Sequence, residues 1–126
     1  MKFYSRKLIK PSDLNARNTL FGGSLLKWID EEAGIYAMTK LESKNVVTKY
    51  MSEINFVNSA QQGDVIEIGL KFQKVGRTSI TFSCQVRNIF DKQIIINIEN
   101  IIFVLVNKDG KAIPHHKTLD NLSRVI

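Results

Sequence analysis

Residues 24–40 carry the apolar spacing of one long amphipathic helix, and this stretch limits the fold more than any other. Gly22 and Gly23 precede it, where the chain must turn and where the first amide groups of a helix lack intrahelical partners. The apolar residues recur with a period of about 3.6, which buries one face of a helix. They are Leu25, Ile29, Ala33 and Tyr36, with Leu26 and Ala37 alongside.

The segments after residue 44 change to the period of β-strands. Their apolar residues alternate with polar ones or run continuously, and short turns separate most of them. One long helix and several such strands predict an α+β fold, in which an antiparallel sheet curls around the helix. The predicted strands are 46–57, 64–75, 78–90 and 94–106, with 3–9 as a candidate first strand.

Composition agrees with a single domain over residues 1–126. The chain is 44% hydrophobic, and no low-complexity linker interrupts it. Cys84, the single cysteine, lies in an alternating segment, so we interpret it as a core residue and expect neither a disulfide nor a metal site. No segment has the roughly 20 apolar residues that span a bilayer, and no secretory leader is recognised. We therefore expect a soluble cytoplasmic protein with no membrane partner.

The charge of the chain is strongly basic. A formal net charge of +6 and a pI near 9.6 fit a nucleic acid, an anionic surface or an anionic small molecule. However, the basic residues are scattered, and the aromatic residues, 9% of the chain, form no base-stacking ladder. We expect no nucleic-acid partner, whereas an anionic metabolite fits this charge at least as well.

Asp30 raises the main question about function, because Ile29 and Ala33 indicate a buried helix face nearby. A buried carboxylate without partners costs several kcal/mol. One row along the helix contains Leu26, Asp30, Gly34 and Ala37. Gly34 removes bulk one turn after the carboxylate, at a cost of about 1 kcal/mol relative to alanine. Asp30 either begins the solvated run 30–32 or is a half-buried base or nucleophile near helix amides that suit an oxyanion.

The motif N-x-x-x-x-x-F-G-G-x-L-L-x-x-x-D-E-x-A, residues 15–33, resembles that of the hotdog-fold acyl-coenzyme A thioesterases. The bacterial group with an aspartate on the central helix is the most similar. The resemblance continues through the "GD" and "VGRTS" turns of residues 46–88 and the tail "FVLVNKDGKAIPHH", so it covers nearly the whole chain. It implies a hotdog fold, with an antiparallel sheet wrapped around one long central helix, and hydrolysis of acyl-coenzyme A to free acid and coenzyme A.

The resemblance also implies roles for individual residues. Asp30 would be the general base for a hydrolytic water or the nucleophile on the thioester carbonyl. The backbone amide of Gly23 would polarise that carbonyl, and Asn15 would orient the water or hold the thioester. Thr48 is a further polar candidate, with a one-residue ambiguity against Val47. A thioester is already an activated acyl group, so no cofactor or metal is expected, and coenzyme A belongs to the substrate.

Coenzyme A binding is assigned, through the same resemblance, to Gly22 and to one turn. This turn would lie along the pantetheine arm, with its arginine and nearby lysines available to the phosphates. Its residues are Gly76, Arg77, Thr78 and Ser79. We expect Phe21, Trp28 and Met51 to shape the acyl tunnel.

Two positions depart from the family pattern. Asn18 stands where many relatives have glycine, so we expect a different shape for the loop after Asn15. Phe21 stands where relatives often have histidine, and it offers no proton-transfer group. His115 and His116 are expected to have tail or surface roles, since no spaced partner ligands occur.

The resemblance further implies a homo-oligomer. Asn15 of one subunit would face Asp30 of the other, so a dimer would form the active site, alone or within a trimer of dimers. The doubly apolar segment 94–106 and an uncovered sheet edge independently argue for at least a dimer. Two other functions stay open. One is a non-catalytic hotdog module that binds acyl-coenzyme A as a sensor, and the other is a dehydratase, which the lack of a histidine near the helix disfavours.

Overall fold

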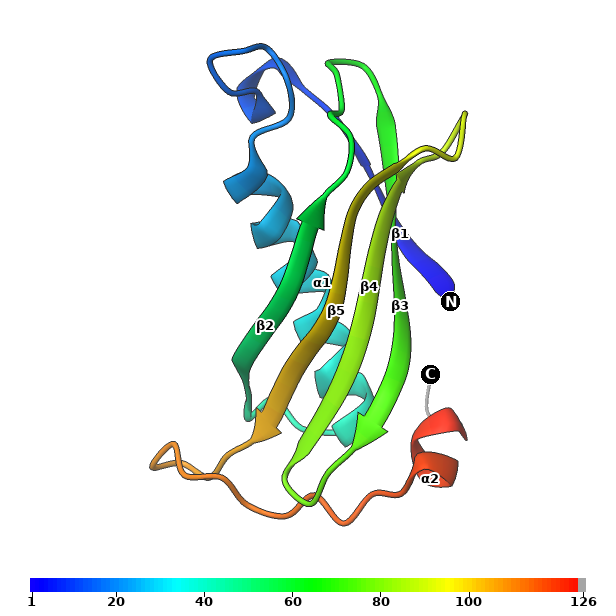
Figure 1. Ribbon diagram of the computed structural model, residues 1–126. Helices are drawn as coiled ribbons and strands as arrows, with labels where there is room; N and C mark the ends of the chain where they lie inside the picture. The colour runs from blue at the N-terminus through cyan, green and yellow to red at the C-terminus, as the bar shows by residue number, and fades with distance from the viewer. Residues whose placement is uncertain (125–126) are drawn as a thin grey trace.

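The computed structural model describes residues 1–124, in which a five-stranded antiparallel sheet curves around one long helix (Figure 1). This confirms the predicted α+β architecture, including the candidate first strand. The elements in chain order are β1 (Lys2–Leu8), the 3-10 helix η1 (Pro11–Asp13), α1 (Gly22–Leu41), β2 (Val46–Phe56), β3 (Val65–Val75), β4 (Ser79–Asn88), β5 (Ile94–Leu105) and α2 (Leu119–Arg124).

The helix α1 begins two residues earlier than the sequence pattern predicts. Gly22 and Gly23 therefore form its first turn and do not precede it. Phe21 is the N-cap residue and provides no side-chain hydrogen bond to the first amides. At the other end, Glu42 adopts a left-handed conformation with φ of 54°, and its amide closes the last turn.

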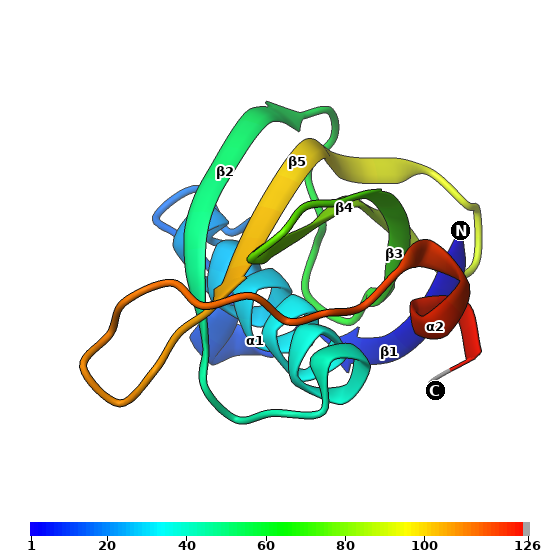
Figure 2. The ribbon, with the colours of Figure 1, turned by 90° about the horizontal axis from the view of Figure 1, so that it is seen from below.

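The core lies between the inner face of α1 and the concave side of the sheet (Figure 2). Ala33 and Ala37 are fully buried, and their small side chains let the helix approach the strands closely. Phe82 of β4 fills the centre, with its ring centroid 5.0 Å from that of Tyr36 and 6.0 Å from that of Phe103. Cys84 is also buried in this core, as predicted.

The strand order β1-β3-β4-β5-β2 places β1 and β2 at the two edges of the sheet. β2 follows α1 in the chain and pairs only with β5 among the described residues. The sequence predicts an uncovered edge but not which strand forms it, and this 11-residue strand is one of the two edges. Large apolar side chains are exposed on or beside it: Phe21, Val47, Tyr50, Phe56 and Val57.

The carboxy-terminal tail passes under the β3–β4 turn and is fastened there by His115. This histidine is buried, with Nε2 3.0 Å from the carbonyl oxygen of Ser79, and its Nδ1 accepts a hydrogen bond from the amide of Lys117. The tail role is therefore correct and a surface position is wrong, because the turn covers the ring. His116 is exposed. No helix within residues 1–124 is long and apolar enough to cross a membrane.

Candidate functional site

Asp30 lies on the flank of α1, beside β2. Its side chain is exposed in the single chain, which agrees with the solvated alternative and not with half-burial. The reason is topological: β2 is the last strand of the sheet, and no further strand within residues 1–124 covers this flank of the helix. Thr48 Oγ1 donates a hydrogen bond of 2.6 Å to Asp30 Oδ1. This length is that of a charge-assisted bond to a carboxylate, so Thr48 holds Asp30 in one orientation.

A β-bulge explains why Thr48, and not Val47, faces the helix. Thr48 pairs with Phe103 on β5, whereas Tyr50 pairs with Ile102, so the intervening Lys49 is an extra residue in the ladder. Such bulges re-aim side chains and break the strict alternation of a strand. Alternation alone therefore could not decide between the two candidates, and the register of β2 on β5 decides it.

Gly34 lies one turn after Asp30, and no close neighbour requires a glycine at this position. A Cβ added there would lie 3.7 Å from the ring of Phe103, which is an ordinary van der Waals distance. The packing of one chain would thus accept alanine.

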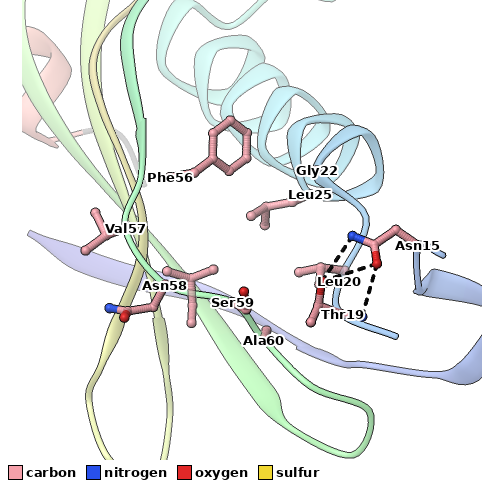
Figure 3. A pocket seen from close by; sticks show the side chains of 11 residues that line it. Asn15, Thr19, Leu20, Gly22, Leu25, Phe56, Val57, Asn58, Ser59 and Ala60 are labelled. Carbon is pink, nitrogen blue, oxygen red and sulfur yellow. Dashed lines mark hydrogen bonds between the residues drawn. The ribbon is translucent and has the colours of Figure 1, made fainter. Parts of the chain in front are cut away.

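A cavity of about 460 Å³ opens at the amino-terminal end of α1 (Figure 3). Four segments form it: the loop before α1, the first turns of α1, the end of β2 with the connection that follows it, and the start of β5. Its wall mixes apolar side chains with hydroxyl and amide groups. The lining residues are Asn15, Thr19, Leu20, Gly22, Leu25, Phe56, Val57, Asn58, Ser59, Ala60 and Ile95.

Asn15 organises the loop on one side of this cavity. Its Oδ1 accepts hydrogen bonds from the amides of Arg17 (2.9 Å) and Thr19 (3.2 Å), and its Nδ2 donates to Thr19 Oγ1 (3.0 Å). Asn18 in the same loop has a φ of 61°, a left-handed conformation that asparagine and glycine both adopt. The backbone at Asn18 therefore gives no local reason for the expected difference in loop shape.

The two glycines let two aromatic rings approach the start of α1 closely. A Cβ at Gly23 would lie 2.9 Å from the ring of Phe21, and one at Gly22 would lie 3.4 Å from the ring of Phe56. The first amides of a helix have no intrahelical acceptor, and here no side chain caps them. Uncapped amides between two aromatic rings at a cavity are suited to polarise a carbonyl or to bind an oxyanion.

The predicted site residues fall into three places in one chain. Asn15 and Gly22 line the cavity, whereas Asp30 is bonded to Thr48 on the helix flank. The turn 76–79 lies at the opposite end of the molecule from the start of α1 (Figure 1). Seven residues separate the first-turn glycines from the carboxylate, which is roughly 10 Å along a helix. One chain therefore does not bring all of these groups to one reacting carbonyl.

The turn of residues 76–79 is held from both sides. The amide of Gly76 donates to the carbonyl of Ser79 (2.9 Å), and the amide of Leu105 donates to the carbonyl of Thr78 (2.9 Å). The amide of His115 donates to the carbonyl of Arg77 (3.2 Å), while the Arg77 side chain is exposed. The backbone of the turn is thus fixed, and its cationic side chain faces solvent.

The expected tunnel residues do not line the cavity. Trp28 and Met51 are partly buried and pack against the core, and Phe21 is exposed. The sequence interpretation missed Phe56 and Val57, which do line it. Two consecutive apolar residues at the end of a strand were the available signal, because alternation leaves one of them outside the core. Within residues 1–124, no three His, Cys, Asp or Glu side chains are placed to hold a metal ion.

Known proteins share this sequence pattern and this architecture. The sequence model of the thioesterase superfamily matches residues 17–95. An uncharacterized acyl-CoA thioester hydrolase of Buchnera aphidicola is 29% identical over 112 residues, which cover 84% of this chain and 82% of the relative. Another, of Haemophilus influenzae, is 35% identical over 64% of this chain, and the match spans about half (52%) of that relative. A hexameric hotdog-fold thioesterase of Campylobacter jejuni is 28% identical with a TM-score of 0.77, covering 95% of this chain and 92% of that structure.

Proposed function

Since this chain belongs to the thioesterase superfamily and has the hotdog fold, we propose that it hydrolyses acyl-coenzyme A to a free acid and coenzyme A. The observation that carries the proposal is the 2.6 Å hydrogen bond from Thr48 to Asp30, which presents an oriented carboxylate on the flank of α1. The helix also begins with uncapped amides at a cavity. The reaction needs no resident cofactor, because a thioester is already an activated acyl group.

The chemistry assigned to these groups begins with the Asp30 carboxylate. Acting as a base, it takes a proton from a water molecule while the water oxygen attacks the thioester carbonyl. The carbon–sulfur bond then breaks, and the proton passes to the departing thiolate. Acting as a nucleophile, the carboxylate attacks the carbonyl carbon and the carbon–sulfur bond breaks, which leaves a mixed anhydride and the thiolate. Water then cleaves the anhydride to the free acid and the Asp30 carboxylate, and the released proton passes to the thiolate. In both routes the amide of Gly23 stabilises the oxyanion, a contribution worth roughly 3–4 kcal/mol for a well-aimed donor.

Two chains would complete the site by pairing their β2 edges. A two-fold axis reverses the strand direction, so the second β2 adds antiparallel to the first and extends the sheet. The reversal sets the start of one α1, with Asn15, toward the flank of the other α1, with Asp30. It also brings the turn 76–79 of one copy to the end at which the other copy's cavity opens. The exposed apolar side chains along β2 support this pairing.

The decisive experiment compares Asp30→Asn with wild type on a panel of acyl-coenzyme A thioesters of increasing chain length, with release of free thiol as the signal. We expect the substitution to lower turnover by about 10²–10⁴-fold, as is typical for loss of a positioned acid–base group. Glu31→Gln is the matched control, because Glu31 is the next exposed carboxylate on the same helix. Turnover that survives Asp30→Asn would refute the assigned role. Binding without turnover in wild type would instead indicate a sensor module.

A further inference from the structure

We propose that this protein has a second binding site, separate from the thioesterase site, for a small carboxylate that carries a flat apolar group. The site is a cavity of about 220 Å³ between β1, the carboxy-terminal half of α1, and β3. Ligands of drug size occupy pockets of about 300–1,000 Å³, so this cavity fits a smaller molecule. The proposal does not depend on the hydrolytic function.

Three lysines give the cavity its charge. Lys2, Lys40 and Lys71 contribute to its lining, and no aspartate or glutamate does so among the described residues. Lys40 is only 6% exposed, and its Nζ donates a hydrogen bond of 2.8 Å to the carbonyl of Leu122 in α2. Burial and the nearby Lys2 charge lower the pKa of Lys40. The exposed charges of Lys2 and Lys71 would attract an anion to the cavity.

Aromatic rings supply the complementary apolar surface. The ring centroid of Tyr36 lies 4.9 Å from that of Tyr4 and 5.4 Å from that of Phe72. The Nζ of Lys40 lies 5.3 Å from the Tyr36 centroid and 5.6 Å from the Phe72 centroid, so its charge sits against ring faces. The Tyr4 hydroxyl donates a hydrogen bond of 3.3 Å to that of Tyr36. Cations and hydroxyls beside ring faces are the partners that an aryl carboxylate can use together.

The position of this cavity separates it from the proposed active site. It shares no lining residue with the larger cavity at the start of α1. It also lies next to β1, whereas the exposed strand β2 is at the other edge of the sheet (Figure 2). Pairing of two chains through β2 would therefore leave it uncovered.

The proposal is tested by titrating the full, assembled protein with benzoate. Binding is monitored through the NMR signals of the backbone amides of the isotopically labelled chain. We expect saturable binding with a dissociation constant on the order of 1 mM, and shifts at Leu70 and Phe72. Lys71→Gln should weaken binding about threefold, because Lys71 is an exposed charge at the rim. Lys74→Gln is the matched control, since it removes an exposed lysine from the same strand outside the cavity.

Four results would overturn the proposal. The first is that benzoate does not saturate the protein at concentrations about tenfold above the expected dissociation constant. The second is that the amide shifts are confined to the cavity that contains Asn15 and Gly22. The other two are that uncharged benzamide binds as well as benzoate, and that Lys71→Gln and Lys74→Gln weaken binding equally. Hydrolytic activity is not part of the readout. A failure of the thioesterase proposal can therefore be distinguished from a failure of this one.

Discussion

Replacing Thr48 by valine isolates what the hydrogen bond to Asp30 contributes. Valine has nearly the same shape as threonine and lacks only the hydroxyl that donates at 2.6 Å. Hydrogen bonds to charged groups contribute about 1.5–3 kcal/mol, and the exposure of Asp30 favours the lower end because water competes for the carboxylate. A loss of about 1.4 kcal/mol in the transition state is tenfold in rate. We therefore expect Thr48→Val to lower kcat about tenfold.

The assay is steady-state hydrolysis of the best acyl-coenzyme A in the chain-length panel, with kcat and KM measured separately. KM should change little, because Thr48 positions Asp30 and does not line the substrate cavity. Thr48→Ser keeps the hydroxyl and should stay near wild type. Thr39→Val serves as the control, since the Thr39 hydroxyl donates only to the carbonyl of Ile35 on an exposed helix face. An unchanged kcat in Thr48→Val, or an equal loss in Thr48→Ser, would refute the reasoning.

Three further predictions concern assembly and stability. Tyr50→Lys should yield monomers in sedimentation and lose hydrolysis in parallel, because an edge lysine opposes strand pairing. Phe90→Lys, at an exposed position in the turn between β4 and β5, should do neither. Gly34→Ala should stabilise the fold by about 0.5–1 kcal/mol in thermal unfolding, because the added Cβ would make only an ordinary contact with Phe103; a loss of stability would contradict this. Glu67→Gln should cost about 2 kcal/mol near neutral pH in urea unfolding, because it removes the 2.8 Å ion pair with Arg87.

The pH dependence of the Glu67 effect follows from its pKa. The hydrogen bond from Arg87 holds the pKa of this buried carboxyl below its ordinary value of 4.5. The ion pair therefore contributes fully above that value, and its contribution is lost as the pH falls through the lowered pKa of the folded state. The difference in unfolding free energy between wild type and Glu67→Gln should shrink below pH 4.5. A constant difference across this range would contradict the assignment.

The elements of the fold were largely predictable because their signals are local. Helical spacing places α1 to within two residues at its start, and alternating or continuous apolar residues locate all five strands. The one error at the helix start concerns Gly22 and Gly23. Glycine before a helical pattern normally indicates a turn, but here the chain turns at Phe21, whose extended backbone starts the helix directly.

The environment of Asp30 was much less predictable. Its neighbours Ile29 and Ala33 are fully buried, yet the carboxylate itself is exposed in one chain. A period of 3.6 identifies the buried stripe of a helix but not which strand, if any, covers its margin. That depends on β2 being at the edge of the sheet, a property of strand order that no local pattern encodes.

The sequence by itself determined the helix, the strands and the set of polar residues that can do chemistry, because periodicity and residue type are read over a few neighbours. The tertiary structure alone decided which of those residues meet. Thr48 contacts Asp30, 18 residues away, through a bulge at Lys49 that shifts the register of β2 on β5. Asn15 lies apart from Asp30 because it precedes α1, whereas Asp30 lies in the middle of this helix. Register and separation depend on pairing between distant segments, so they are decided only when the whole chain is folded.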